Sequence, residues 1–213
     1  MLLVSSAIKH VYRKFLMLKL FSIIFFFCVQ SVFSQKMDLK FEGLTIQDGL
    51  SSNTVNDIAR GVDGFMWIAT DDGISRYDGK RFKNYRSSEK DSFSLCGNKS
   101  LSLLVNKDND LLVGTSNGLN IYNPVLDRFE RLQEGYEIRD IIEYSKGGYM
   151  LASSEGLIHL DANYQEEKRY LHDDKIPNSI TTNSLSCLLE DSKGRLWVNS
   201  FQFGIDLMYK TFT

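Results

Sequence analysis

The chain has 213 residues, of which 43% are hydrophobic and 24% are charged, and its formal net charge is −2. This length and composition are sufficient for one globular domain with a sizeable core. The balanced charge argues against nucleic acid as the main partner, because proteins that bind phosphate backbones need a basic surface.

Three cysteines are present, and no two of them form a CxxC pair, so the sequence predicts no metal site. Cys28 lies in an apolar N-terminal stretch. Cys96 and Cys187 lie far apart, and a disulfide between them would require their segments to meet. We favour the interpretation that both are buried free thiols, which pack as small hydrophobic residues.

Residues 1–34 are typical of an export signal. A positively charged first half contains no acidic residue and is followed by an apolar stretch at 20–29. Residues 32–34 (Val-Phe-Ser) suit a cleavage site directly before Gln35. The apolar stretch is shorter than the roughly 20 residues that a membrane-spanning helix needs. We therefore predict a signal peptide and an exported, periplasmic protein.

Two alternatives to a cleaved signal stay open. The segment could act as an uncleaved signal anchor, or it could form a buried helix of the domain. The start is also open between Met1 and Met17, because Met17 would itself begin a compact signal peptide. Lipid attachment at Cys28 is disfavoured, since bulky phenylalanines precede it where small residues are needed.

The strongest signal in the chain is a repeated segment, first seen at Asp63 to Ile74. Related segments align on four bulky residues, which are spaced 45, 38 and 47 positions apart: Trp67, Leu112, Met150 and Trp197. A repeat of about 40–45 residues with strand-turn-strand content is the signature of a propeller blade.

Each repeat is predicted to form four strands. In the first repeat these are 55–59, 65–70, 74–77 and 81–85, separated by turns rich in Asp and Gly. The predicted fold class is all-β: a partial β-propeller of about four blades of four-stranded antiparallel sheet, preceded by an N-terminal hydrophobic signal helix. The propeller covers residues 35–213, with blades at about 49–85, 94–132, 135–170 and 179–213.

Residues 38–46 resemble the last strand of each repeat. We expect them to form a ring-closing strand that completes the final blade. Such closure removes the exposed edge that an open sheet would offer to aggregation.

Two further positions recur and predict structural roles. Small residues recur where neighbouring blades should crowd, and a polar residue interrupts this series in the fourth repeat: Ala69, Gly114, Ala152 and then Asn199. Hydroxyl residues follow directly, and we expect them to satisfy backbone groups at the next turn: Thr70, Thr115, Ser153 and Ser200. Leu112 and Met150 occupy the same position as Trp67 and Trp197, which requires bulk and not an aromatic face. We therefore interpret both tryptophans as inter-blade core and not as sugar-stacking residues.

No catalytic motif is present. The chain has no phosphate-binding loop, no His-Glu-x-x-His and no Gly-x-Ser-x-Gly. His159 is predicted to be structural, and 71–72 and 108–110 are predicted to be turn residues, not calcium ligands. We therefore predict no catalytic residue, no metal and no cofactor. The ligand-binding residues are unknown, and we expect them among the segments that do not repeat: 86–98, 171–184 and 199–203.

The repeat resembles a known family on several stretches. Residues 63–70 (Asp-Gly-Phe-Met-Trp-Ile-Ala-Thr) followed by 73–78 (Gly-Ile-Ser-Arg-Tyr-Asp) are similar to the two-component regulator propeller repeat. Residues 49–55 resemble the opening of that repeat, and 191–198 (Asp-Ser-Lys-Gly-Arg-Leu-Trp-Val) are a second good match. The second and third repeats match more weakly because they lack the Trp. The resemblance covers about residues 38–213.

This resemblance implies the periplasmic sensor region of a hybrid two-component histidine kinase. In that family two propellers of about seven blades precede a β-sandwich, a membrane helix, a kinase and a response regulator, and many members sense oligosaccharides. It implies export, a sensory role, a possible oligosaccharide ligand and a homodimeric full-length receptor. It transfers no binding residues, because ligand contacts in the family come from variable loops.

The leading functional hypothesis is therefore an extracytoplasmic ligand-binding propeller for glycans, not an enzyme, with membrane contact only through its N-terminal segment or through parts outside this chain. The chain ends after about four blades, and we expect it to be an N-terminal fragment of a longer sensor without the kinase. The alternatives are a structural or protein–protein interaction propeller and, less favoured, a propeller lyase or glycosidase.

Overall fold

The computed structural model describes residues 12–23 and 39–209, which fall into two units separated between Gly43 and Leu44. In the first unit, residues 12–23 form a helix with exposed side chains. The rest of the predicted signal, including Cys28 and the cleavage site, lies outside the described residues. Among the helices that are described, none has the length and apolar character needed to cross a membrane.

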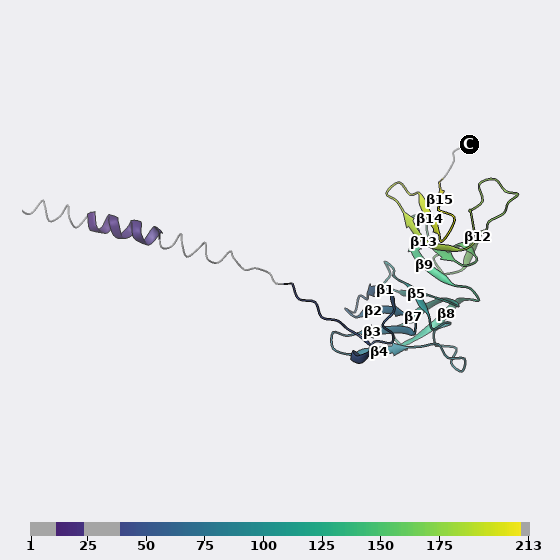
Figure 1. Cartoon of the computed structure of the whole chain (residues 1–213), viewed down its shortest axis with the longest axis horizontal. Helices are drawn as coiled ribbons and strands as arrows, with labels where there is room; N and C mark the ends of the chain where they lie inside the picture. Colours follow the sequence, from purple (N-terminus) through teal and green to yellow (C-terminus); the bar gives the residue numbers. More distant parts are fainter. Residues whose placement is uncertain (1–11, 24–38, 210–213) are drawn as a thin grey trace, which may run out of the picture. The chain divides into compact units, whose positions relative to one another are not determined.

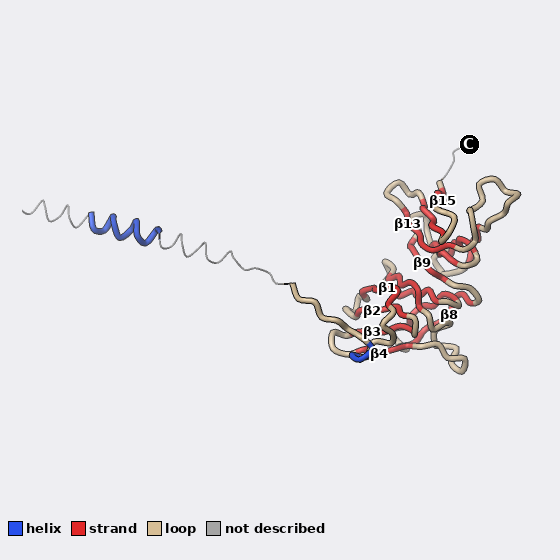
Figure 2. Tube along the Cα trace, in the orientation of Figure 1, coloured by secondary structure: helices blue, strands red, loops and turns tan. Residues whose placement is uncertain are grey.

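The second unit consists of consecutive antiparallel sheets (Figures 1 and 2). In every sheet the strands pair in chain order, so each repeat of the sequence folds on itself. The first sheet contains β1 (Val55–Arg60), β2 (Met66–Thr70), β3 (Gly73–Tyr77) and β4 (Phe82–Tyr85); the second contains β5 (Ser100–Val105), β6 (Leu111–Thr115), β7 (Gly118–Asn123) and β8 (Arg128–Glu134).

The third sheet contains β9 (Ile138–Glu143), β10 (Tyr149–Ser153), β11 (Gly156–Leu160) and β12 (Glu166–Tyr170); the fourth contains β13 (Leu185–Glu190), β14 (Leu196–Ser200) and β15 (Ile205–Met208). The first strands of successive sheets are neighbours: β1 contacts β5, β5 contacts β9, and β9 contacts β13. This arrangement confirms the prediction of four propeller blades. Within the described residues the fourth blade has three strands.

The predicted ring-closing strand at 38–46 is a point of difference, because residues 39–45 form no strand. Thr45 instead caps a short 3-10 helix, η2 (Ile46–Asp48), and its carbonyl accepts from Asp48 N and Leu50 N. A strand needs a partner for its backbone groups. Here the backbone of Thr45 serves a local turn.

Each pair of neighbouring blades shares one hydrophobic core. Between the first two blades Trp67, 2% exposed, packs against Tyr122 and Phe129. Leu112 occupies the same place between blades two and three, and Met150 between blades three and four. The interpretation of this position as inter-blade core is correct for these three residues. The sheets bury both faces, so their middle strands read as continuous apolar runs.

Trp197, the fourth member of this series, is half-buried. Its indole Nε1 donates to Asp191 Oδ2 at 3.1 Å, and the Arg195 guanidinium lies over its ring. Asp191 also accepts from the backbone N–H groups of Lys193 and Arg195 and so fixes the turn before β14.

The recurring hydroxyls have the role predicted for them. Thr70, Thr115, Ser153 and Ser200 each donate to the carbonyl of the glycine that ends the turn, at 2.7–3.2 Å, and each accepts from a backbone N–H within that turn. The second and third strands of every blade are therefore joined by one kind of hydroxyl-capped hairpin.

Carboxylates tie the inner strands together at two of the three junctions. Asp57 on β1 accepts from Leu103 N, and Asp140 on β9 accepts from Leu188 N, each at 2.7 Å. Burial raises the pKa of the Asp140 carboxyl, and the hydrogen bonds from the backbone N–H groups of Leu188 and Ile141 oppose this rise. At the middle junction Ser102 takes the equivalent place, and its buried hydroxyl has no partner among the described residues.

A second carboxylate joins the outer parts of blades one and two. Asp127, in the turn between β7 and β8, accepts from Tyr85 Oη and Tyr122 Oη at 2.6 Å, from Arg76 at 3.2 Å and from Lys83. Burial raises the pKa of Asp127, but these hydrogen bonds outweigh it and hold the pKa below its usual range. The contact between blades one and two is therefore partly ionic near the outer strands and apolar in its core.

The small-residue position is tightest at Gly114. A Cβ there would lie 2.3 Å from Ser102 Oγ and 2.6 Å from the carbonyl oxygen of Ile138 in the next blade. We expect Gly114→Ala to lower the free energy of unfolding by about 1–3 kcal/mol, because the neighbouring blade must move. Urea denaturation of the full chain measures this. Gly43→Ala, which would meet nothing within 4 Å, is the control, and equal stability of both variants would contradict the prediction.

Candidate functional site

The first of the non-repeating segments, 86–98, is built into the framework. Leu95 is fully buried in the Trp67 core. The Arg131 guanidinium donates to the carbonyls of Ser88, Asp91, Ser94 and Leu95 at 3.1–3.3 Å. Arg131 therefore holds this connector through its backbone carbonyl groups. The connector has little conformational freedom to adapt to a ligand.

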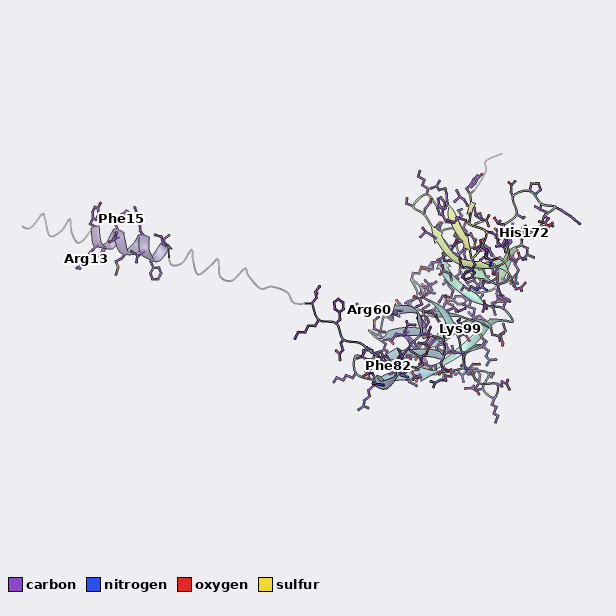
Figure 3. The ribbon with its side chains drawn as sticks, viewed as in Figure 1. Arg13, Phe15, Arg60, Phe82, Lys99 and His172 are labelled. Carbon is purple, nitrogen blue, oxygen red and sulfur yellow. The ribbon has the colours of Figure 1, made fainter. Side chains whose placement is uncertain are left out.

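The connector 171–184 differs, because residues 171–178 are all exposed. It extends from the sheets after β12 (Figure 1), and Figure 3 labels His172 at its start. Nδ1 of His172 lies 2.8 Å from the Ile180 carbonyl, and Nε2 lies 3.1 Å from Asp174 Oδ1. Both partners are acceptors, so the ring satisfies both contacts only when it is protonated on both nitrogens.

The far end of this connector meets the third non-repeating segment at the junction of blades three and four. Arg139, the second residue of β9, donates from Nη1 to Ser184 Oγ at 3.2 Å and to the Leu185 carbonyl at 2.8 Å. Its guanidinium carbon lies 5.0 Å from the centre of the Phe201 ring, which belongs to the turn between β14 and β15. Two predicted variable segments thus converge on one arginine.

Glu137 completes this group. Its Oε2 accepts from Arg139 Nε at 2.9 Å and also from Nη2, whereas its Oε1 has no partner among the described residues. The arginine side chain is 17% exposed and the glutamate 37%, while Phe201 is 67% exposed. We call Glu137, Arg139, Ser184 and Phe201 the junction site. It presents an aromatic face and a carboxylate oxygen to solvent, both held by one largely buried guanidinium.

Asn199, the polar residue in the series of small residues, bonds to Ser186 on the neighbouring strand. Its Nδ2 donates to Ser186 Oγ at 2.9 Å, and Ser186 Oγ donates back to the Asn199 carbonyl at 3.2 Å. The amide therefore bonds across the first two strands of blade four, and it is a structural group.

The other residues considered from the sequence are also bound within the fold. His159 Nε2 lies 3.0 Å from the Gly147 carbonyl, as expected for a structural histidine. Asp71 accepts from Asn56 at 2.9 Å, and Asp72 pairs with Arg86 at 2.9 Å. Over residues 12–23 and 39–209, no group of three or more His, Cys, Asp or Glu is placed to hold a metal.

Cys96 and Cys187 are free thiols. Cys96 is buried, as predicted, and burial raises its pKa. The prediction is wrong for Cys187, which is exposed on β13. Its position is equivalent to Asp57, Ser102 and Asp140 in the other inner strands. Asp57 and Asp140 bond there to the blade that follows, and among the described residues no blade follows the fourth to cover Cys187.

Comparison with known proteins bears on these repeats. Residues 49–72 and 179–202 match the family model described as two component regulator propeller. These two segments are similar to the two-component regulator propeller repeat. The prediction of this repeat type is confirmed, and the matched segments are the first and fourth repeats, those that carry the tryptophans.

The similar proteins are much longer than this chain. The curated relative Histidine kinase P4 of Formosa agariphila is 40% identical over 76 residues, which are 35% of this chain and 6% of that protein. The extracellular domain of BT3049, a B. thetaiotaomicron protein assigned to the hybrid two component systems, shares the fold with a TM-score of 0.69 and 23% identity, over 78% of this chain and 25% of its own. That of BT4673 gives 0.67 and 22%, over 79% and 23%.

The matched repeats share one asparagine with a defined structural role. The side-chain oxygens of Asn53 and Asn183 accept from the backbone N–H of Ile46 and His172, and Asn98 accepts from that of Ser87, at 2.7–3.0 Å. Each asparagine therefore joins the start of the connector to the residues directly before the inner strand of its blade. These asparagines therefore fix the connectors that lead into blades one, two and four.

The sequence analysis predicts no ligand-binding role for Glu137 or Arg139. A signal was available: the second residue of the inner strand is Asn56, Leu101, Arg139 and Ser186 in the four repeats, and only one of these is a large cation. Their convergence with Phe201 could not be read from spacing, because the two segments are about 60 residues apart.

The contacts of His172 predict a pH-dependent connector. The hydrogen bond to the Ile180 carbonyl, aided by Asp174 and Asp173, raises the pKa of His172 above 6.5. Because the folded state favours the protonated ring, this stabilisation is complete below the unfolded pKa and is lost as the pH rises through the raised value. We expect stronger protection of 171–184 from amide exchange at about pH 5.5 than at about pH 8.5, after correction for intrinsic rates.

In His172→Gln the difference between the two pH values should disappear, while His159→Gln should retain it. Protection that is independent of pH in the unmodified chain would show that the connector does not depend on the charge of His172.

Proposed function

We propose that this chain is the ligand-binding propeller of an extracytoplasmic sensor, that its ligand is a glycan, and that it forms part of a longer receptor that signals through a histidine kinase. The two-component regulator propeller repeats and the curated histidine kinase relative support the signalling role. The fold shared with extracellular domains of hybrid two component systems supports a location outside the cytoplasm.

The observation that carries the binding role is the junction site. Phe201 is an exposed aromatic ring packed on the Arg139 guanidinium, and Glu137, bound to the same guanidinium, offers an acceptor. Ligand sites combine apolar or aromatic surface with a few placed polar groups. A sugar ring has an apolar face for the aromatic ring and hydroxyl donors for the carboxylate.

We propose binding and not catalysis. Hydrolysis of a glycosidic bond requires two carboxyl groups on either side of the bond, and in the junction site the single carboxylate is paired with arginine. The remaining parts of the receptor, its membrane attachment and its dimeric state belong to the proposal for the longer protein.

Truncation of the exposed ring tests the site. We expect Phe201→Ala to weaken binding of an oligosaccharide recognised by the full chain about tenfold, equivalent to about 1.4 kcal/mol, because the apolar face of the sugar loses its contact. Isothermal titration against a panel of oligosaccharides measures this. Phe203→Ala, in the same turn and also exposed, is the matched control and should bind normally. The proposal fails if no oligosaccharide binds the unmodified chain, or if both variants bind as it does.

A further inference from the structure

The guanidinium of the junction site has no pair of free donors for an anionic ligand, because four of its five N–H groups already bond to the protein. Arg139 Nε and Nη2 bond to Glu137, and Nη1 bonds to Ser184 Oγ and the Leu185 carbonyl. Recognition of a sugar carboxylate or sulfate by arginine normally uses two parallel N–H donors. Here neither edge of the fork keeps two free N–H groups, so a bidentate contact with the ligand is blocked and the arginine mainly supports the site.

The exposed part of the ion pair is its negative end. The glutamate side chain is more exposed than the arginine, 37% against 17%. Its Oε1, without a partner among the described residues, can accept a hydrogen bond from a ligand. A ligand that spans the two groups bound to Arg139 therefore meets an acceptor, while the compensating positive charge is less exposed and is engaged by hydrogen bonds within the protein.

An anionic sugar placed on Phe201 would bring its charge near this carboxylate in a partly desolvated place, where like charges repel more strongly than in bulk water. The overall net charge of −2 provides no compensating field. A neutral sugar has no such penalty and can donate a hydroxyl to Oε1.

We infer that the junction site selects uncharged saccharides over uronate-containing ones, and that Glu137 is the residue that sets this preference. The inference rests on the proposed glycan-binding function and adds the ligand class and the residue responsible. Phe201 supplies affinity for both classes, and Glu137 supplies the discrimination between them.

The test pairs each neutral oligosaccharide with its C6-oxidised counterpart, so that the two ligands differ only in the carboxylates. Both are titrated into the full chain at low salt. We expect the neutral member to bind at least tenfold more tightly. In Glu137→Gln the ratio should fall at least fivefold, mainly through tighter uronate binding, because the variant leaves the guanidinium charge uncompensated. This gain should shrink at high salt.

The control is Glu130→Gln. Glu130 lies on β8 of the second blade and accepts from Asn123 at 3.0 Å, so its loss changes net charge equally and should leave the ratio unchanged. Circular dichroism and urea denaturation establish that the variants fold. If Glu137→Gln unfolds, Glu137→Asp, which keeps the charge, should retain the preference of the unmodified chain.

Three results overturn the inference. The unmodified chain could bind the uronate member as well as or better than the neutral one. Both glutamine variants could change the ratio equally, which would indicate net charge and not the site. If Phe201→Ala weakens binding but the neutral preference is absent, the inference fails while the proposed function stands; if no sugar binds at all, both fail.

Discussion

The whole structure depends on the requirement that each small sheet bury two apolar faces. A four-stranded sheet cannot do so alone, and only another sheet of the same kind fits against it at propeller spacing. Trp67, Leu112 and Met150 fill the three spaces between blades, and Gly114 allows the closest approach. The repeat is therefore a consequence of packing: each blade must be able to serve as the neighbour of the next.

The framework could be predicted from the sequence because its determinants recur at fixed positions. Bulky residues, small residues and turn hydroxyls appear in the same order in each repeat, and the structure gives them the expected contacts. The structure differs from the predictions where only one segment, without equivalents in the other repeats, supported them. The segment 38–46 resembles a strand, but a strand also requires a partner, which no local pattern supplies. Cys187 is exposed because its position faces the blade that follows, and no blade follows the fourth among the described residues.

The candidate site could be located only in outline. The expectation that function lies in non-repeating segments is consistent with the meeting of 171–184 and 199–203 at Arg139, whereas 86–98 proved to be framework. The arginine itself lies within a repeated strand, where it replaces Asn56, Leu101 or Ser186 of the other copies. A substitution of this kind becomes visible when residues are compared between repeats, but its partners become known only when the chain is folded.

The Asp127 carboxylate has a consequence for how the protein is made. Its donors on the first blade, Arg76, Lys83 and Tyr85, precede it by 42–51 residues. As the chain emerges from the ribosome or is exported, the first blade can form its strands but cannot complete this cluster until the second repeat is nearly whole. Each blade is thus finished by the one that follows. We expect assembly to proceed from the N-terminus, with the newest blade always waiting for its partner.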